Sequence, residues 1–136
     1  MTADPQDQAF DVPTSADASR ILEEITPVAG LLASPLDPVL SDPTRLRIQA
    51  ALHALPGTAA MSFTILRKAL MLTDGNLGKH VHVLMDAGFV DAEEHWRGKR
   101  RTTLYRATSA GRAAFDAHVR ALNAIIKASS ASADPA

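Results

Sequence analysis

The sequence predicts a small, mainly α-helical domain with one β-hairpin, a fold of the α+β class. Apolar residues recur at helical spacing on both sides of residues 89–107. That segment has the pattern of two β-strands around a glycine-containing turn. Capping residues mark the starts of helices, and Pro56-Gly57 and Gly88 mark ends. The 136 residues suffice for one domain with a modest core.

The composition excludes several classes of protein. Hydrophobic residues make up 46% and charged residues 21%, which is ordinary for a soluble globular chain. Because there is no cysteine, neither a disulfide nor a thiolate metal site can form. No apolar run approaches the roughly 20 residues that span a bilayer. The acidic N-terminus also lacks the apolar core of a signal peptide. We therefore expect a cytoplasmic protein without a cofactor.

The net charge of −1 conceals a segregation of charge along the chain. Residues 1–40 hold seven acidic residues and one basic residue, whereas residues 41–127 hold thirteen basic and seven acidic ones. A basic body behind an acidic leader prompts a search for a nucleic-acid surface. Surface charges that fall unevenly by chance would give the same asymmetry. The charge pattern therefore needs support from the motifs.

The first 35 residues divide into a tail and a helix. Residues 1–17 are rich in Ala, Asp, Gln, Pro and Ser and have few apolar anchors, so we expect a disordered acidic tail. Residues 18–35 carry the first helical periodicity, and Pro27 should kink or break that helix. Pro35 and Pro38 then mark a connection.

Three short helices follow, and each begins at a side chain that can cap it. These capping residues are Asp42, which precedes a proline at the first helical position, Ser62 and Thr73. The third helix has its apolar face at i, i+4 and i+7, and Gly88 closes it in the manner of a left-handed cap. Its apolar positions are Leu77, Val81 and Leu84.

The hairpin comes next. Phe89–His95 predicts one strand and Thr102–Ala107, which is rich in β-branched residues, predicts the returning strand. We expect a turn over Trp96–Lys99. Thr108 can cap a last helix that runs to about Ser129.

This order of elements, together with five sequence stretches, resembles the winged-helix regulators of the MarR and ArsR type. The resemblance covers residues 36–122. It implies a winged helix-turn-helix, to which this chain adds N-terminal and C-terminal helices. We expect the DNA-binding domain with its C-terminal dimerisation helix over residues 36–128 and a disordered tail over 129–136. The stretches are Leu36–Leu40, Pro43–Ile48, Leu72–His80, Leu84–Val90 and Arg101–Arg112.

The resemblance implies a transcriptional regulator, a repressor, that binds double-stranded DNA sequence-specifically. Its recognition helix, near residues 74–87, would enter the major groove, which admits one α-helix. On this helix the face opposite the apolar stripe holds Gly75, Lys79, His82 and Val83, with Asn76 and His80 at its flank. Asn pairs with adenine, and Lys reaches guanine or phosphate. The predicted contacts are Thr73, Asp74, Gly75, Asn76, Lys79, His80 and His82.

Four of these contacts have a plainer alternative. Lys79 and His82 could form an ordinary solvated helix face. Asp74 in the first turn stabilises the helix dipole, and it could also accept a hydrogen bond from cytosine. His80 could instead fill the edge of the core.

The segment around residues 95–101 is the predicted wing. It carries four permanent cations, which suit phosphate or a narrow minor groove. The alternative is a solubilising turn that prevents edge pairing. Trp96, the only tryptophan, is expected to pack the wing against the body rather than to stack on a base. The four cations are Arg97, Lys99, Arg100 and Arg101.

The last helix carries an apolar stripe at i, i+4, i+7 and i+11 from Phe115. Its later half extends beyond the family core and predicts a two-fold homodimer, in which the N-terminal helix takes part. The competing interpretation is a monomer in which the N-terminal helix covers the stripe. The predicted interface residues are Ile21, Leu22, Ile25, Val119, Leu122, Ile125 and Ile126.

Other activities have little support. His80 and His82 lie two apart on a helix and face different directions, so we expect no metal site. A small apolar effector between helices would leave no residue signature. The acidic leader could shield the basic face, a hypothesis that only the charge split motivates. No catalytic motif is present, so an enzyme is not expected. The main rival is a winged-helix interaction module whose basic tip binds an acidic partner protein.

Overall fold

The computed structural model describes residues 12 and 14–131 and confirms the predicted fold class. It has five helices and a small sheet, and the helices and the two long strands follow one another in the predicted order. The elements are α1 (Ser15–Leu32), α2 (Pro43–His53), β1 (Met61–Ser62), α3 (Phe63–Leu70), α4 (Asp74–Asp86), β2 (Val90–Arg97), β3 (Arg100–Ala107) and α5 (Ser109–Ala131).

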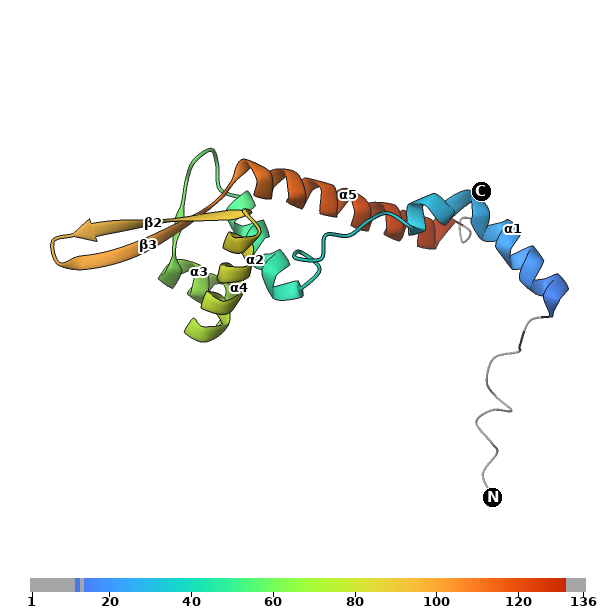
Figure 1. Cartoon of the computed structure of the whole chain (residues 1–136), viewed down its shortest axis with the longest axis horizontal. Helices are drawn as coiled ribbons and strands as arrows, with labels where there is room; N and C mark the ends of the chain where they lie inside the picture. The colour runs from blue at the N-terminus through green and yellow to red at the C-terminus, as the bar shows by residue number, and fades with distance from the viewer. Residues whose placement is uncertain (1–11, 13, 132–136) are drawn as a thin grey trace, which may run out of the picture.

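The molecule is elongated, with the hairpin at one end and α1 at the other (Figure 1). Helices α2, α3 and α4 form a small body beneath the base of the hairpin. Strands β2 and β3 project from this body, and α5 leaves it in the opposite direction (Figure 1). Helix α1 packs against α5. Within the described part of the chain, no helix is both long and apolar enough to cross a membrane.

The predicted tails are shorter than expected at their inner ends. Residues 15–17 belong to α1, and Thr14 and Asp17 form a reciprocal capping box at the N-terminus of this helix. Residues 129–131 likewise continue α5. Residues 1–11, 13 and 132–136 lie outside the described residues, so the rest of the two tail predictions falls there.

Pro27 does not break the first helix. Helix α1 continues through it, and Figure 1 shows the helix changing direction along its length. Proline lacks the amide that would bond one turn back, and its ring crowds that turn, which accounts for a bend without a break.

All four predicted capping residues are confirmed. In each case the side-chain oxygen accepts a hydrogen bond from the amide three residues further along, which satisfies a donor that the helix start leaves free. The pairs are Asp42 with Arg45 at 3.0 Å, Ser62 with Ile65 at 3.2 Å, Thr73 with Asn76 at 3.1 Å and Thr108 with Gly111 at 2.9 Å. Gly88 has φ 79°, so the left-handed cap of α4 is also confirmed.

The sheet has one more strand than the sequence predicts. Strand β1 pairs antiparallel with β3, giving the order β1-β3-β2. Two residues are too few to leave a period-2 pattern, so β1 is invisible in the sequence. Strands β2 and β3 pair from Val90↔Ala107 to Arg97↔Arg100. The turn is therefore only Gly98-Lys99, and Trp96 and Arg97 belong to β2 rather than to the turn.

The core lies where α2, α3, α4 and the base of the sheet meet. The predicted stripe of α4 is fully part of it, as are apolar residues from the loop before α2 and from both long strands. Its buried members are Leu40, Ile48, Leu52, Leu66, Leu77, Val81, Leu84, Val90 and Ala107.

Helix α5 buries a different face from the predicted stripe. Its buried positions are Gly111, His118, Ala121 and Ala128, which are small apart from the histidine. The His118 Nδ1 accepts a hydrogen bond from the Asp37 amide at 3.0 Å. Small residues let α5 approach its neighbours closely, so the larger aliphatic side chains are turned partly toward solvent.

Met71, which ends α3, is expected to be a weak point of the fold. Its φ is 55°, a left-handed conformation that a side chain disfavours, and the residue is 91% exposed. Met71→Gly should raise the free energy of unfolding by about 1 kcal/mol, because glycine adopts this conformation without strain. Denaturant titration would measure the change, and an unchanged or lowered midpoint would contradict it.

Candidate nucleic-acid interface

One face of α4 is free for contact with another molecule. Leu77, Val81 and Leu84 are buried in the core, and this fixes the rotation of the helix about its axis. The opposite face is exposed, and near the helix N-terminus it lacks a side chain at Gly75, where an added Cβ would meet nothing within 4 Å. The exposed predicted contacts are Thr73, Asp74, Gly75, Asn76, Lys79 and His82.

Asp74 has a structural partner that the sequence did not reveal. Its carboxylate lies 2.9 Å from the Arg67 Nε of α3, and it also lies in the first turn of α4. The carboxylate is mostly exposed, so the pair contributes modestly to stability. It links the two helices of the helix-turn-helix and partly neutralises Arg67.

His80 lies apart from the other predicted contacts. It is partly buried against the start of α2, with its Nδ1 3.3 Å from the Arg45 Nη1 and 3.8 Å from the Asp42 carboxylate. The Arg45 amide, through its hydrogen bond, holds the pKa of the Asp42 carboxyl below its ordinary value. This cap therefore stabilises the fold at neutral pH, and its contribution is lost as the pH falls through the lowered pKa.

The wing places its cations at the tip of a two-residue turn. Gly98 has φ 61°, as the first position of a tight hairpin turn requires. Within residues 14–131, Arg97, Lys99 and Arg100 have no carboxylate within ion-pair distance. Arg101 does, because its Nη1 lies 3.2 Å from the Glu94 Oε1. Three of the four predicted cations are thus available at the tip.

Strand β2 also carries acids that the charge count of the tip overlooked. Glu93 lies 3.4 Å from Arg106 and 3.5 Å from His95, and Glu94 pairs with Arg101. The hairpin is therefore acidic along much of β2 and basic along β3 and the tip. Cross-strand pairs of opposite charge stabilise the ribbon modestly and leave a net positive end.

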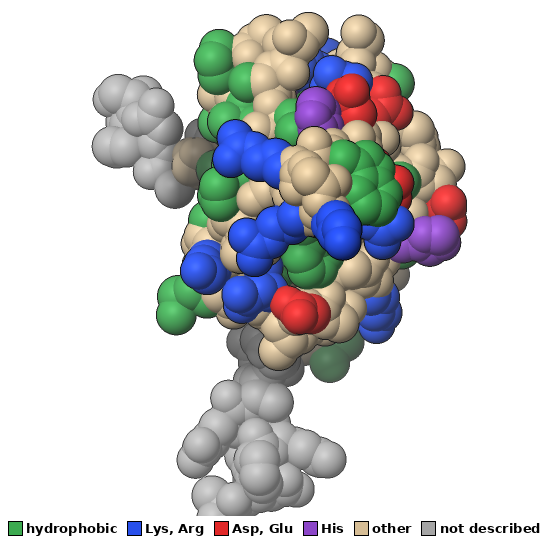
Figure 2. Space-filling model, turned by 90° about the vertical axis from the view of Figure 1, so that its left-hand side faces the viewer, with side chains coloured by type: hydrophobic (Ala, Val, Ile, Leu, Met, Phe, Trp, Pro, Cys, Tyr) green, Lys and Arg blue, Asp and Glu red, His purple; other side chains and the backbone are tan. Residues whose placement is uncertain are grey.

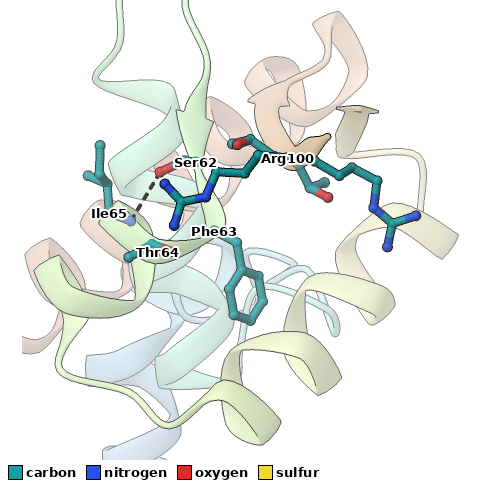
Figure 3. Close-up of a pocket in the computed structure, with 8 residues that line it drawn as sticks. Ser62, Phe63, Thr64, Ile65 and Arg100 are labelled. Atoms are coloured by element: carbon teal, nitrogen blue, oxygen red, sulfur yellow. Dashed lines mark hydrogen bonds between the residues drawn. The ribbon is translucent and has the colours of Figure 1, made fainter. Parts of the chain in front are cut away.

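The view onto the hairpin end shows where the charges gather. In Figure 2, Lys and Arg side chains collect over the middle of this face, with acidic side chains mainly to one side. A hollow of about 620 Å³ lies between the start of α3 and the outer part of β3. Figure 3 shows Ser62, Thr64 and Ile65 of the α3 start beside Arg100, with the Phe63 ring pointing away from the Ser62 hydroxyl.

A tight joint connects α4 to the wing, and sequence reasoning missed most of it. The Phe89 carbonyl accepts hydrogen bonds from the Thr108 amide at 3.1 Å and from the buried Gln49 Nε2 at 3.2 Å. The Thr108 hydroxyl donates to the Gly88 carbonyl at 2.6 Å. Because Gly88 follows the end of α4 and Phe89 precedes β2, this joint fixes the hairpin relative to the helix. A buried glutamine in an otherwise apolar helix face is the signal that could have revealed it.

Arg112 is a second structural residue that the sequence did not reveal. Its guanidinium donates to three carbonyls at and after the end of α2, those of His53 at 3.1 Å, Leu55 at 3.2 Å and Gly57 at 3.2 Å. It thereby satisfies acceptors that the end of a helix leaves free.

In the sheet, burial raises the pKa of Tyr105 above its ordinary value.

The sequence is similar to a known protein family and to a protein of another organism. A family model described as a winged helix DNA-binding domain matches residues 44–126. An uncharacterized protein of Methanocaldococcus jannaschii is 32% identical over 81 residues, which are 60% of this chain and 85% of the relative.

Solved structures agree with this family. A transcriptional regulator homologue from Pyrococcus horikoshii OT3 has a TM-score of 0.61 at 27% identity, over 74% of this chain and 93% of that chain. Wild-type MarR from E. coli in its apo form has a TM-score of 0.55 at 15% identity, over 92% and 89%. A mutant MarR from E. coli complexed with operator DNA has a TM-score of 0.54 at 19% identity, over 80% and 76%. This chain therefore belongs to the winged helix DNA-binding domain family, and it has the fold of MarR.

Proposed function

We propose that this protein is a sequence-specific regulator that binds double-stranded DNA as a homodimer and represses transcription. Helix α4 enters the major groove, and the tip of the wing lies on phosphates and in the minor groove. Asn76 and Lys79 contact bases, while Arg97, Lys99 and Arg100 bind the backbone or the narrow groove. Occupation of promoter DNA by such a dimer excludes other proteins, which is why repression is the proposed outcome.

One observation carries this proposal. The exposed face of α4 lies at the same end of the molecule as three tip cations that have no carboxylate partner in the described part of the chain. Clustered cations at an exposed tip repel one another. A bound polyanion reduces this repulsion more than screening by water does. The joint around Gln49 and Phe89 holds helix and wing in a fixed relation, which suits two contacts with one rigid duplex.

The test is a binding titration with labelled duplexes from the region upstream of the gene, in competition with bulk DNA. We expect at least one duplex to bind more tightly than bulk DNA. If each protomer neutralises about three to five phosphates, log K should fall with log salt at a slope of roughly −5 to −9. A slope near zero would show that the protein does not neutralise DNA phosphates, and DNA binding would be excluded. Tip-dependent capture of an acidic protein without DNA binding would favour the interaction module instead.

The division of labour between helix and wing has its own test. Asn76→Ala or Lys79→Ala should change which duplex is preferred, because base contacts carry the sequence information. Selection from a randomised duplex library would measure the preference. If a wing variant shifts the preference in the same way as Asn76→Ala, the proposed division is wrong.

The proposed dimer uses the end of the molecule opposite the wing. None of the residues of α1 is buried, although α1 packs on α5. Exposed fractions reach 62% at Leu22 on α1 and 61% at Ile126 on α5. In the competing interpretation, α1 covers the apolar stripe of α5 within a single chain. Even with α1 packed on α5, a broad apolar surface stays exposed. The partly or largely exposed apolar residues are Ile21, Leu22, Ile25, Val28, Leu32, Leu122, Ile125 and Ile126.

A hollow of about 420 Å³ lies in this surface, between residues 24–32 of α1 and Ala128-Ser129 of α5. Side chains of a second copy would fill such a hollow and bury several aliphatic groups, each worth about 1.5–3 kcal/mol. We therefore propose that α1 and α5 of a second copy fill this hollow.

A charge placed in the proposed dimer interface should halve the molecular mass measured by light scattering. The wild-type chain should show twice its monomer mass by light scattering at micromolar concentration, and Ile126→Glu should show the monomer mass because it places a charge in the interface. Ile65→Glu is the matched control, since Ile65 is 58% exposed but lies on α3. A strictly monomeric wild-type chain would exclude the dimer.

A further inference from the structure

Trp96 does not pack the wing against the body, contrary to the sequence expectation. Trp96 is the only tryptophan of the chain, and 63% of the residue is exposed. Within the described residues, the aromatic pairs are His53–Phe115 and Phe63–Tyr105, and Trp96 belongs to neither. A large apolar ring has thus been left in water two residues before the tip of the wing. This arrangement calls for a partner outside the chain.

The position of Trp96 on the hairpin follows from strand alternation. Side chains six residues apart on a strand share a face, so Trp96 lies on the same face as Val90. At the base of the hairpin this face is part of the core, where Val90 is 2% exposed and pairs with Ala107. Toward the tip, every residue from 91 to 100 is exposed. Trp96 therefore continues the core-facing side of the sheet beyond the point where the body covers it.

The indole lies near the cations of the tip, and its own face of the hairpin carries an ion pair. Its partner across the hairpin is Arg101, whose Nη1 lies 3.2 Å from the Glu94 Oε1 on the same face. Arg97 follows Trp96 in β2 and, by strand alternation, lies on the opposite face. Lys99 and Arg100 complete the tip. An aromatic ring close to a cationic tip suits nucleic acid, because the cations bind phosphates while the ring covers the apolar faces of sugars and bases.

We propose that Trp96 is a DNA-contacting residue whose indole leaves water when the wing enters the minor groove. The inference rests on the proposed function. Apolar wedges are a recurrent device for minor-groove contact, and the indole N–H can donate to the acceptors on the floor of that groove. Trp96 supplies the part of wing binding that does not depend on charge, whereas Arg97, Lys99 and Arg100 supply the salt-dependent part.

The experiment uses the intrinsic fluorescence of the chain, which comes from one position when excitation is selective for tryptophan. Acrylamide quenching is measured for the free full-length protein and for the protein saturated with the tightest upstream duplex. Saturation is established independently, from the anisotropy of a label on the DNA. We expect at least about a twofold fall in the quenching constant on binding, because the ring becomes enclosed.

Two variants test whether the contact matters for affinity. Trp96→Ala should weaken binding about tenfold, the scale of one aromatic contact with a base, and Trp96→Phe should retain most of the affinity. Neither variant removes a cation, so the salt slope should not change. The melting temperature should also stay near the wild-type value, because the side chain is mostly exposed. A large fall in melting temperature for Trp96→Ala would assign it a structural role and overturn the proposal.

The outcomes separate this inference from the proposed function. If labelled DNA binds but the indole stays as accessible as in the free protein, the Trp96 contact is wrong and DNA binding stands. If no duplex binds, the proposed function fails and the contact with it. If the free protein already protects the indole at the concentrations where it dimerises, a second copy is the partner, and DNA contact is excluded.

Discussion

Replacing Gly111 with alanine should destabilise the protein by about 3 kcal/mol or more, which would lower its melting temperature by about 10 °C. A Cβ at this position would lie 2.1 Å from the Phe89 carbonyl oxygen and 2.6 Å from the Gln49 Nε2. The first of these atoms is backbone, held by two hydrogen bonds, so it cannot move aside cheaply. Either α5 must shift or the joint between α4 and the wing must open.

Gly78→Ala is the matched control for stability. Gly78 is also helical, but a Cβ there meets nothing within 4 Å, so the substitution should raise stability by up to about 1 kcal/mol. Thermal unfolding followed by circular dichroism would measure both variants. Equal small effects from the two substitutions would show that the close approach at Gly111 carries no energetic weight.

Neutralising the tip of the wing should weaken binding to every duplex by about 100-fold or more. The variant is Arg97→Ala, Lys99→Ala and Arg100→Ala together, and each lost phosphate contact should make the salt slope less negative by about 0.9. Because these side chains have no carboxylate partner among the described residues, the free fold should lose little. Titration of specific and non-specific duplexes at several salt concentrations measures affinity and slope together.

A variant of equal charge change at the other end is the control. Arg20→Ala, Arg120→Ala and Lys127→Ala remove three cations from α1 and α5, each at least partly exposed. If DNA binding depended only on the net charge of the chain, both triple variants would weaken it alike, and the assignment of the wing would fall. A slope that changes only with the tip variant would support it.

Local sequence signals predicted the helices well. A cap involves residues three positions apart, and a buried helix face involves residues within two turns, so Thr73 and the stripe from Leu77 to Leu84 could be recognised directly. The hairpin was predicted with its tip too wide, because a run of cations resembles a turn. Only the pairing of Arg97 with Arg100 showed that both belong to strands.

What the sequence could not provide depends on contacts between distant segments. Strand β1 exists because Met61 meets Tyr105, and the ion pair of Glu94 with Arg101 exists because the hairpin brings them together. The exposed state of Trp96 has the same origin: its surroundings depend on how far the hairpin projects from the body. The stripe on α5 was predicted by size, whereas the close approach of Gly111 selected the face with small residues.

The length of α5 has a consequence for how a dimer would meet its operator. At 1.5 Å per residue, 23 residues make a rod of about 35 Å between the α1 end and the winged-helix body. In the proposed dimer this rod acts as a lever, whose fulcrum lies at the distant apolar surface. A rotation of about 6° at the fulcrum would displace the reading helix by about 3.5 Å, close to the 3.4 Å rise of one base pair. Small repacking beside Ile126 would thus change the half-site register by a whole step.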